Sequence, residues 1–167
     1  MRILGIDPGT AVLGFGVIDS GAPATLVECG VVRTPATQPL PLRLAVIHEG
    51  VTELITRHRP DAIAVEGVFY GKNVRSAIVL SHARGVILLA AQQAGIPTHE
   101  YSPAQVKKSV VGRGAALKSQ VGYAVAQLLR LRTAPKPADA ADAVAIALTH
   151  LLVGVGRSRI APWRTRG

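Results

Sequence analysis

The chain has 167 residues, of which 49% are hydrophobic, and its mean hydropathy is +0.32. This length and composition predict one folded domain with a substantial core and exclude a largely disordered chain. The formal net charge of +9 predicts a polyanionic partner, with nucleic acid favoured over an anionic membrane surface.

The cysteine content and the hydropathy pattern narrow the class of protein further. Cys29 is the only cysteine, which excludes an intramolecular disulfide framework and a cysteine-rich zinc site. No apolar run reaches the ~18 residues that a membrane span needs, and the N-terminus lacks the apolar stretch of a secretion signal. The five histidines are scattered without ligand spacing. We therefore expect a cytoplasmic protein without membrane contact.

The first half of the chain predicts a sheet. Strand-type residues and turn signals predict strands over residues 2–7, 12–19 and 25–34, joined as an antiparallel meander. Helical spacing then predicts a helix over 42–59. The continuous apolar run over 62–68 predicts a strand covered on both faces, which should lie parallel to and beside the first strand.

The second half predicts mostly helices. A helix over 74–94 is apolar nearly all round, which favours a homodimer interface. An edge strand over 97–101 follows, and then helices over 103–111, 115–131 and 138–152. The sequence thus predicts an α/β fold, a five-stranded mixed sheet with helices on both faces. We expect one domain over residues 1–153 and a basic, flexible tail over 154–167.

Two carboxylates interrupt apolar strands. Asp7 ends the first predicted strand, and Glu66 lies in the strand that we place beside it. Pro or Gly follows each acid directly, so both should lie where a strand ends. An ionised side chain there is costly unless a cation meets it. The alternative to a bound metal is a buried structural ion pair, but neither acid has a Lys or Arg near it in its own strand.

The last predicted helix carries two more acids. From residue 101 onward there are eleven Lys and Arg, but the only acids are Asp139 and Asp142. Their spacing of three places both side chains on one helix face, about a turn apart. Favourable interaction with the helix dipole is the alternative explanation for acids near this N-terminus. If the helix packs on the sheet, its first turn can bring both acids to the strand ends.

Carboxylates gathered in this way form an all-oxygen site, which suits hard cations such as Mg²⁺ or Mn²⁺. Two such ions support in-line displacement at phosphorus, because one activates the attacking water and the other stabilises the leaving oxygen. Combined with the positive net charge, the cluster predicts a metal-dependent nuclease.

Four sequence blocks resemble the RuvC family of Holliday-junction resolvases. In chain order they are GIDPGT, IAVEGVFYGKN, QVKKSVVGRGAALKSQV and ADAADAVAIALTH. The resemblance covers nearly the whole chain up to about Val153. It implies an RNase H-like fold, a homodimer, and paired symmetric nicks in a four-way DNA junction during homologous recombination and DNA repair. It also implies a partner complex of the RuvA and RuvB type.

The same resemblance implies roles for individual residues. Asp7, Glu66, Asp139 and Asp142 become the catalytic acids that bind two Mg²⁺ or Mn²⁺ ions. Lys118 becomes a catalytic residue near the scissile phosphate, since a lysine can neutralise charge that develops there. Residues expected to contact DNA are Phe69, Tyr70, Lys72, Asn73, Arg75, Lys107, Lys108, Arg113 and Lys118. Phe69 is expected to stack on bases, whereas Tyr70 departs from what the resemblance leads us to expect.

Three alternatives stay open on the sequence alone. A strand followed by Asp-x-Gly-Thr also begins ATP-binding proteins of the actin and Hsp70-like superfamily. These need two such domains and a second Gly-rich phosphate turn, whereas this chain is too short and has no such turn. Another RNase H-like nuclease acting on RNA or an RNA–DNA hybrid is the second alternative. A non-catalytic junction-binding module is the third, and four intact carboxylates argue against it.

Overall fold

The fold is built on one five-stranded mixed sheet. The computed structural model describes residues 1–67 and 74–154, and for residues 74–76 it describes the backbone only. The strands are β1 (Arg2–Asp7), β2 (Val12–Asp19), β3 (Thr25–Arg33), β4 (Ala62–Glu66) and β5 (Thr98–Tyr101). Their order across the sheet is β3-β2-β1-β4-β5. β1 to β3 form the predicted antiparallel meander, and β4 is parallel to β1 as predicted.

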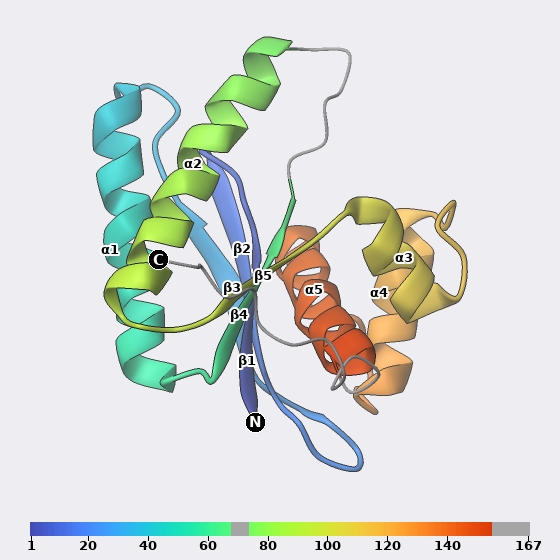
Figure 1. Cartoon of the computed structure of the whole chain (residues 1–167). Helices are drawn as coiled ribbons and strands as arrows, with labels where there is room; N and C mark the ends of the chain where they lie inside the picture. The colour runs from blue at the N-terminus through green and yellow to red at the C-terminus, as the bar shows by residue number, and fades with distance from the viewer. Residues whose placement is uncertain (68–73, 155–167) are drawn as a thin grey trace, which may run out of the picture.

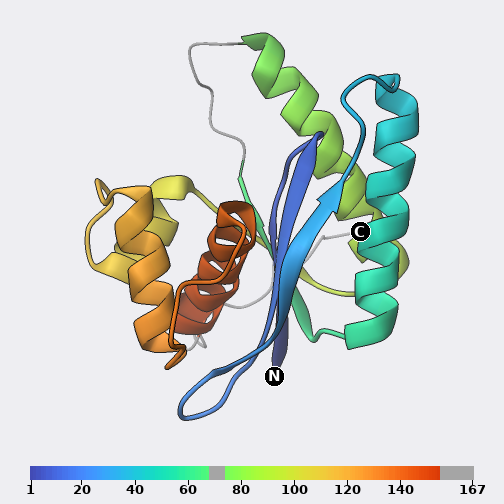
Figure 2. The same cartoon turned by 180° about the vertical axis from the view of Figure 1, so that it is seen from behind.

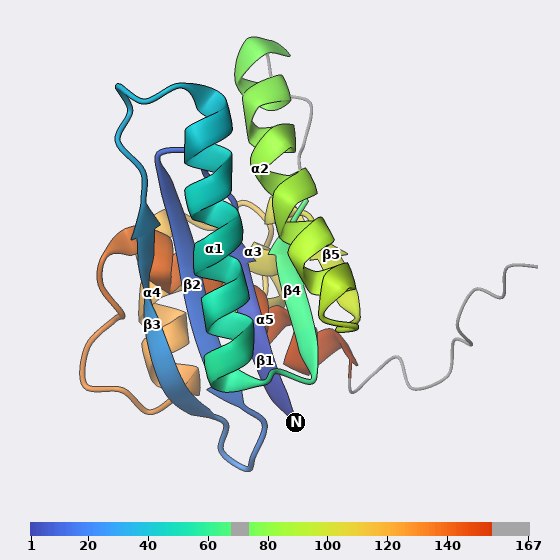
Figure 3. The same cartoon turned by 90° about the vertical axis from the view of Figure 1, so that its left-hand side faces the viewer.

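Helices cover both faces of this sheet (Figure 1). α1 (Leu40–His58) and α2 (Val74–Gln93) run along one face, where Figure 3 shows them in front of the strands. α5 (Ala138–Gly154) lies against the other face, with α3 (Pro103–Val111) and α4 (Lys118–Leu128) packed on its far side, as Figure 2 shows from behind. The predicted α/β fold is confirmed.

The strands alternate between two hydrophobic cores because successive side chains point to opposite faces. Leu4, Ile6, Ile63 and Val65 are fully buried against α1 and α2. Ile3 and Ala64 face the α5 layer instead. α5 is buried along most of its length, from Ala140 to His150. α5 is therefore packed firmly against β1, the strand that ends at Asp7.

Several predicted boundaries were wrong by a few residues. β4 ends at Glu66, so Gly67 is already outside the strand. α4 begins at Lys118 instead of at residue 115. At this start, Gln120 Oε1 accepts a hydrogen bond from Leu117 N (2.9 Å). Its end at Leu128 precedes Arg130, whose positive φ of 52° is incompatible with a continuing helix. Gly154, which we assigned to the tail, is the last residue of α5.

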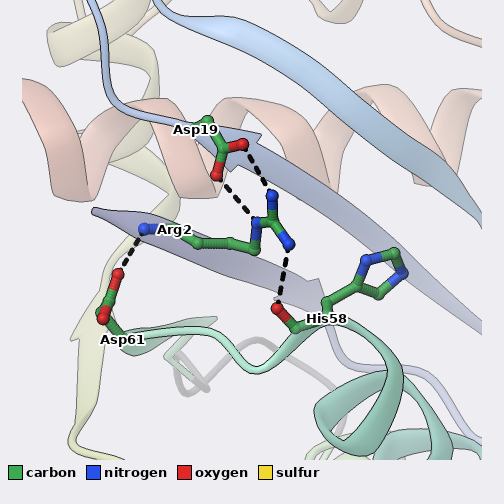
Figure 4. Close-up of polar contacts among 4 residues, drawn as sticks. All are labelled: Arg2, Asp19, His58 and Asp61. Atoms are coloured by element: carbon green, nitrogen blue, oxygen red, sulfur yellow. Dashed lines mark hydrogen bonds and ion pairs between the residues drawn. The ribbon is translucent and has the colours of Figure 1, made fainter.

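The end of the sheet opposite the acids is held by Arg2 (Figure 4). Its guanidinium donates two hydrogen bonds of 2.8 Å to the Asp19 carboxylate and a third, of 3.2 Å, to the His58 carbonyl. Its backbone N–H donates to Asp61 (2.6 Å). These bonds tie β1, β2, the end of α1 and the start of β4 together. In the described part of the chain, no helix is long and apolar enough to cross a membrane.

Candidate active site

Asp7 and Glu66 are neighbours at the ends of the two central strands. Ile6 of β1 pairs with Val65 of β4, so the next residue of each strand, Asp7 and Glu66, comes at the same edge of the sheet. Both follow by two positions a residue that faces α5, and both therefore face α5 as well. Each is only partly buried, which leaves the carboxylates accessible. The sequence prediction that these two strands lie side by side is confirmed.

Glycines on the sheet bring α5 unusually close to Asp7. Gly14 of β2 is the register partner of Asp7, and a Cβ placed on Gly14 would lie 2.1 Å from the Asp139 carbonyl oxygen. A Cβ on Gly5 of β1 would lie 2.1 Å from the Ala143 carbonyl oxygen. Only glycine allows the helix backbone to approach the strands this closely. The first turn of α5 is thereby laid over the end of β1.

The four predicted acids meet at this end of the sheet. The pKa of Asp7 is raised to about 7, first by burial and then by the carboxylates of Glu66, Asp142 and Asp139, while Lys118 lowers it. Burial also raises the pKa of Glu66, and Asp142 raises it further. Like charges at short range disfavour ionisation of each other. These mutual effects place acids from β1, β4 and α5 within electrostatic range of one another.

Two lysines lie within electrostatic range of the cluster. Lys118, at the start of α4, places its Nζ 2.9 Å from Asp142 Oδ2, and this bond raises the pKa of the lysine. Lys107 of α3 lowers the pKa of Glu66. Both helices are thus oriented so that their cationic side chains partly offset the acids. The Lys118 side chain is 78% exposed, so it can also reach a phosphate in solution.

The four carboxylates are donors that suit a hard divalent cation, although their present arrangement does not form a complete ligand set. Among the described residues, which include all four acids, no three His, Cys, Asp or Glu side chains are arranged to hold a metal ion. Lys118 engages one oxygen of Asp142. Carboxylate oxygens alone are the ligands that Mg²⁺ and Mn²⁺ prefer. Burial and the neighbouring carboxylates raise the pKa of Asp7, so a cation bound there would stabilise its charged form.

A polar network that the sequence did not reveal holds the turn after Asp7. Thr34, which is 6% exposed, donates its hydroxyl to the Thr10 carbonyl. Arg43 of α1 donates from Nε to the same carbonyl and to Thr34 Oγ1, both at 3.1 Å. Residues at the end of β3 and on α1 thus fix the loop that leads away from Asp7. The sequence could not predict these hydrogen bonds, because Thr34 and Arg43 belong to no motif and have no regular spacing from Thr10.

The other predicted DNA-contacting residues are only partly placed. Lys108 and Arg113 are exposed near the end of α3. Phe69, Tyr70, Lys72 and Asn73 lie outside the described residues, and Arg75 is placed by its backbone in α2. Arg84 of α2 forms a two-point ion pair with Glu100, with distances of 3.1 and 2.5 Å. The contacts of these residues with DNA remain predictions.

A family model and curated relatives that match this sequence all carry the same description. A family model described as "Crossover junction endodeoxyribonuclease RuvC" matches residues 3–150. A curated protein of that name from Brevibacillus brevis is 50% identical over 151 residues, which is 90% of this chain and 91% of the relative. One of the same name from Halorhodospira halophila is 52% identical over 149 residues, 89% of each chain.

Solved structures show the same similarity in three dimensions. Thermus thermophilus RuvC is 41% identical, with a TM-score of 0.86 over 93% of this chain and 96% of the other. The same protein in complex with a Holliday junction substrate is 42% identical, with a TM-score of 0.87 over 92% and 94% of the two chains. A yeast mitochondrial resolvase shares the fold alone, at 13% identity and a TM-score of 0.67.

Proposed function

We infer, since this chain belongs to the RuvC family of crossover junction endodeoxyribonucleases, that it is a metal-dependent nuclease that resolves Holliday junctions. The observation that carries this function is the meeting of Asp7, Glu66, Asp139 and Asp142 at one edge of the sheet. Because these acids raise one another's pKa, a bound cation explains their gathering at this edge better than a structural role does. The net charge of +9 supplies attraction for a nucleic acid.

We propose that the four acids hold two divalent ions, Mg²⁺ or Mn²⁺. When bound, the ions would activate the attacking water and stabilise the leaving oxygen of the phosphodiester. The chain itself contributes the ligands, holds Asp7 and Glu66 on rigid strands, and keeps α5 against them. Lys118 and Lys107 would offset phosphate charge at the same place, and Lys118 would exchange its partner Asp142 for phosphate or share the two.

The substrate is tested by direct comparison. A synthetic four-way junction, a linear duplex of the same sequence and an RNA–DNA hybrid are each incubated with the full chain, with Mg²⁺, with Mn²⁺ or with a chelator. We expect paired nicks at symmetric positions in the junction alone, and none with the chelator. Cleavage of the hybrid with an intact junction would favour the alternative RNase H-like activity on RNA.

The Mg²⁺ concentration that cleavage requires should rise as the pH falls. Because the pKa of Asp7 is raised to about 7, protons compete with metal for this carboxylate below that pH. We expect the Mg²⁺ concentration for half-maximal cleavage to rise roughly tenfold per pH unit below about 7 and to level off above it. Metal titrations of cleavage between pH 5.5 and 8.5 measure this, and a half-maximal concentration that stays constant over this range would contradict it.

We propose that the protein acts as a homodimer, since paired nicks need two active sites. α2 exposes two large apolar side chains, Ile78 (53% exposed) and Leu89 (52%), on its outer side. Helix positions 78, 82, 85 and 89 form one stripe. Sedimentation at micromolar concentration should show a dimer, and Ile78→Glu with Leu89→Glu should give a monomer. A monomeric wild-type chain would contradict this prediction.

The remaining assignments extend the same proposal. We propose that Phe69, Tyr70, Lys72, Asn73, Arg75, Lys108 and Arg113 contact the junction, with Phe69 stacking on bases. We propose that the nuclease domain extends through the end of α5 at Gly154 and that the basic residues after it lie outside this domain. A branch-migration complex of the RuvA and RuvB type is the expected partner.

A further inference from the structure

A buried hydrogen bond joins the edge strand of the sheet to α5. Tyr101 Oη and His150 Nδ1 are 2.7 Å apart, and both residues are 7% exposed. The His99 ring lies beside that of His150, with 4.4 Å between ring centroids. Burial and His99 lower the pKa of His150, so at neutral pH its ring keeps an unprotonated nitrogen. Hydrogen bonds of this kind are costly to break because the partner left behind stays buried.

Tyr101 stands next to Glu66 in the sheet. The two are register partners at the ends of β5 and β4, and Gly67 N donates to the Tyr101 carbonyl (2.9 Å). Register partners on neighbouring strands point to the same face. The Tyr101 side chain therefore leaves the sheet beside the Glu66 carboxylate and ends on α5. A contact that holds Tyr101 against α5 therefore links the end of β5, beside Glu66, to that helix.

Besides its contacts with β1, α5 contacts the sheet on either side of the acids. Near its N-terminus, the Asp139 backbone rests on Gly14 of β2. Eight residues beyond Asp142, His150 is bonded to Tyr101 of β5. Asp7 and Glu66 lie on β1 and β4, the two strands between these points in the sheet order. These two contacts therefore flank the acids of β1 and β4 and join the sheet to the helix that carries Asp139 and Asp142.

We propose that Tyr101 and His150 are positioning residues of the active site, which hold Glu66 at the correct distance from the acids of α5. The assignment rests on the proposed nuclease function. Neither side chain touches the reacting atoms in this role. The bond acts by preventing β5, and with it the end of β4, from shifting relative to α5. A displacement near 1 Å at such a site is enough to slow catalysis about a hundredfold.

The first test removes the Tyr101–His150 hydrogen bond but keeps the aromatic ring of residue 101. Tyr101→Phe should lower kcat for junction cleavage roughly ten- to a hundredfold, with junction affinity in the absence of divalent metal unchanged. The Mn²⁺ concentration that half-maximally raises the melting temperature should increase as well, which reports metal binding without turnover. His150→Leu should have the same effect, and the double variant should be no worse than either single variant, because both remove one interaction.

Two further variants separate positioning from stability. Thr149→Val is the matched control, because Thr149 is fully buried on the same helix but donates its hydroxyl to Ala145 of its own helix (2.8 Å). It should lower the melting temperature and leave kcat unchanged. His150→Asn should retain most of the activity, because the Asn side-chain oxygen can take the place of Nδ1.

The outcomes of these measurements separate the positioning role of Tyr101 and His150 from the proposed nuclease function. If the wild-type chain cuts junctions and Tyr101→Phe stays within twofold of it, the positioning role is overturned and the nuclease function stands. The same conclusion follows if Thr149→Val loses as much kcat as Tyr101→Phe. A wild-type chain that does not cut junctions with Mg²⁺ or Mn²⁺ would contradict the proposed function itself, and the positioning role with it.

Discussion

Asp7→Asn should abolish junction cleavage and, at the same time, make the metal-free protein more resistant to unfolding. Because we propose that Asp7 is a central metal ligand, its loss should lower cleavage about a thousandfold or more. Junction binding should survive, because the substitution removes a negative charge from a protein that binds a polyanion. Asn keeps the size of the side chain, so β1 and its register with Gly14 are preserved.

The stability gain follows from the pKa of Asp7, which rises from 3.8 to about 7 on folding. An acid with a raised pKa binds its proton more tightly in the folded state. Its contribution to stability is therefore greatest below about pH 4 and is lost as the pH rises to about 7. Above that, the buried charge costs on the order of a few kcal/mol. The uncharged Asn removes this cost, so denaturant unfolding at pH 8 in chelator should show a higher free energy of unfolding.

A matched substitution at the other end of the sheet should act in the opposite direction. Asp19 ends β2 and forms an ion pair with Arg2 at 2.8 Å, which lowers the pKa of the carboxyl group. Asp19→Asn should therefore slightly destabilise the protein at pH 8 and leave cleavage intact. Cleavage by Asp7→Asn at more than a tenth of the wild-type rate would refute the ligand role. Equal stabilities at pH 8 would refute the cost of the buried charge.

The acids were predictable because each breaks a pattern. Asp7 and Glu66 are single charges in apolar runs, and Asp139 and Asp142 are the only acids in the basic stretch from residue 101 onward. The parallel pairing of β1 with β4 followed from the intervening helix. These signals are local in sequence, and they define which residues share one end of the sheet.

The contacts that position the acids were not predictable, because they depend on distances between elements. Gly14 looks like any glycine in a strand, and its role appears only when the α5 backbone is seen against it. His150 has no ligand spacing, and the partner of its ring lies 49 residues earlier, on β5. The sequence predicted that the four acids bind metal but not that Lys118 forms an ion pair with Asp142. Charge balance among side chains from five elements cannot be read from spacing.

Gly14→Ala should test whether the approach of α5 is what assembles the site. The added Cβ would lie 2.1 Å from the Asp139 carbonyl oxygen and 2.6 Å from its carbonyl carbon. Because both atoms belong to the backbone, no side-chain rotation can relieve the contact, and the first turn of α5 must move away from the sheet. Asp139 and Asp142 then move away from Asp7. We expect kcat for junction cleavage to fall about a hundredfold, with unchanged junction affinity in chelator.

Gly30→Ala provides the control for this prediction, because it makes the same change in the same sheet. A Cβ on Gly30 of β3 would meet only the edge of the Phe15 ring, at 3.0 Å, and Phe15 belongs to the core on the α1 and α2 side. A ring edge can yield by a few tenths of an ångström, so this variant should lose some stability and keep its kcat. If both variants lose stability and both cut at the wild-type rate, the acids tolerate a displaced α5. The ions themselves would then have to draw the ligands together, as they can when a flexible carboxylate set folds around a divalent cation.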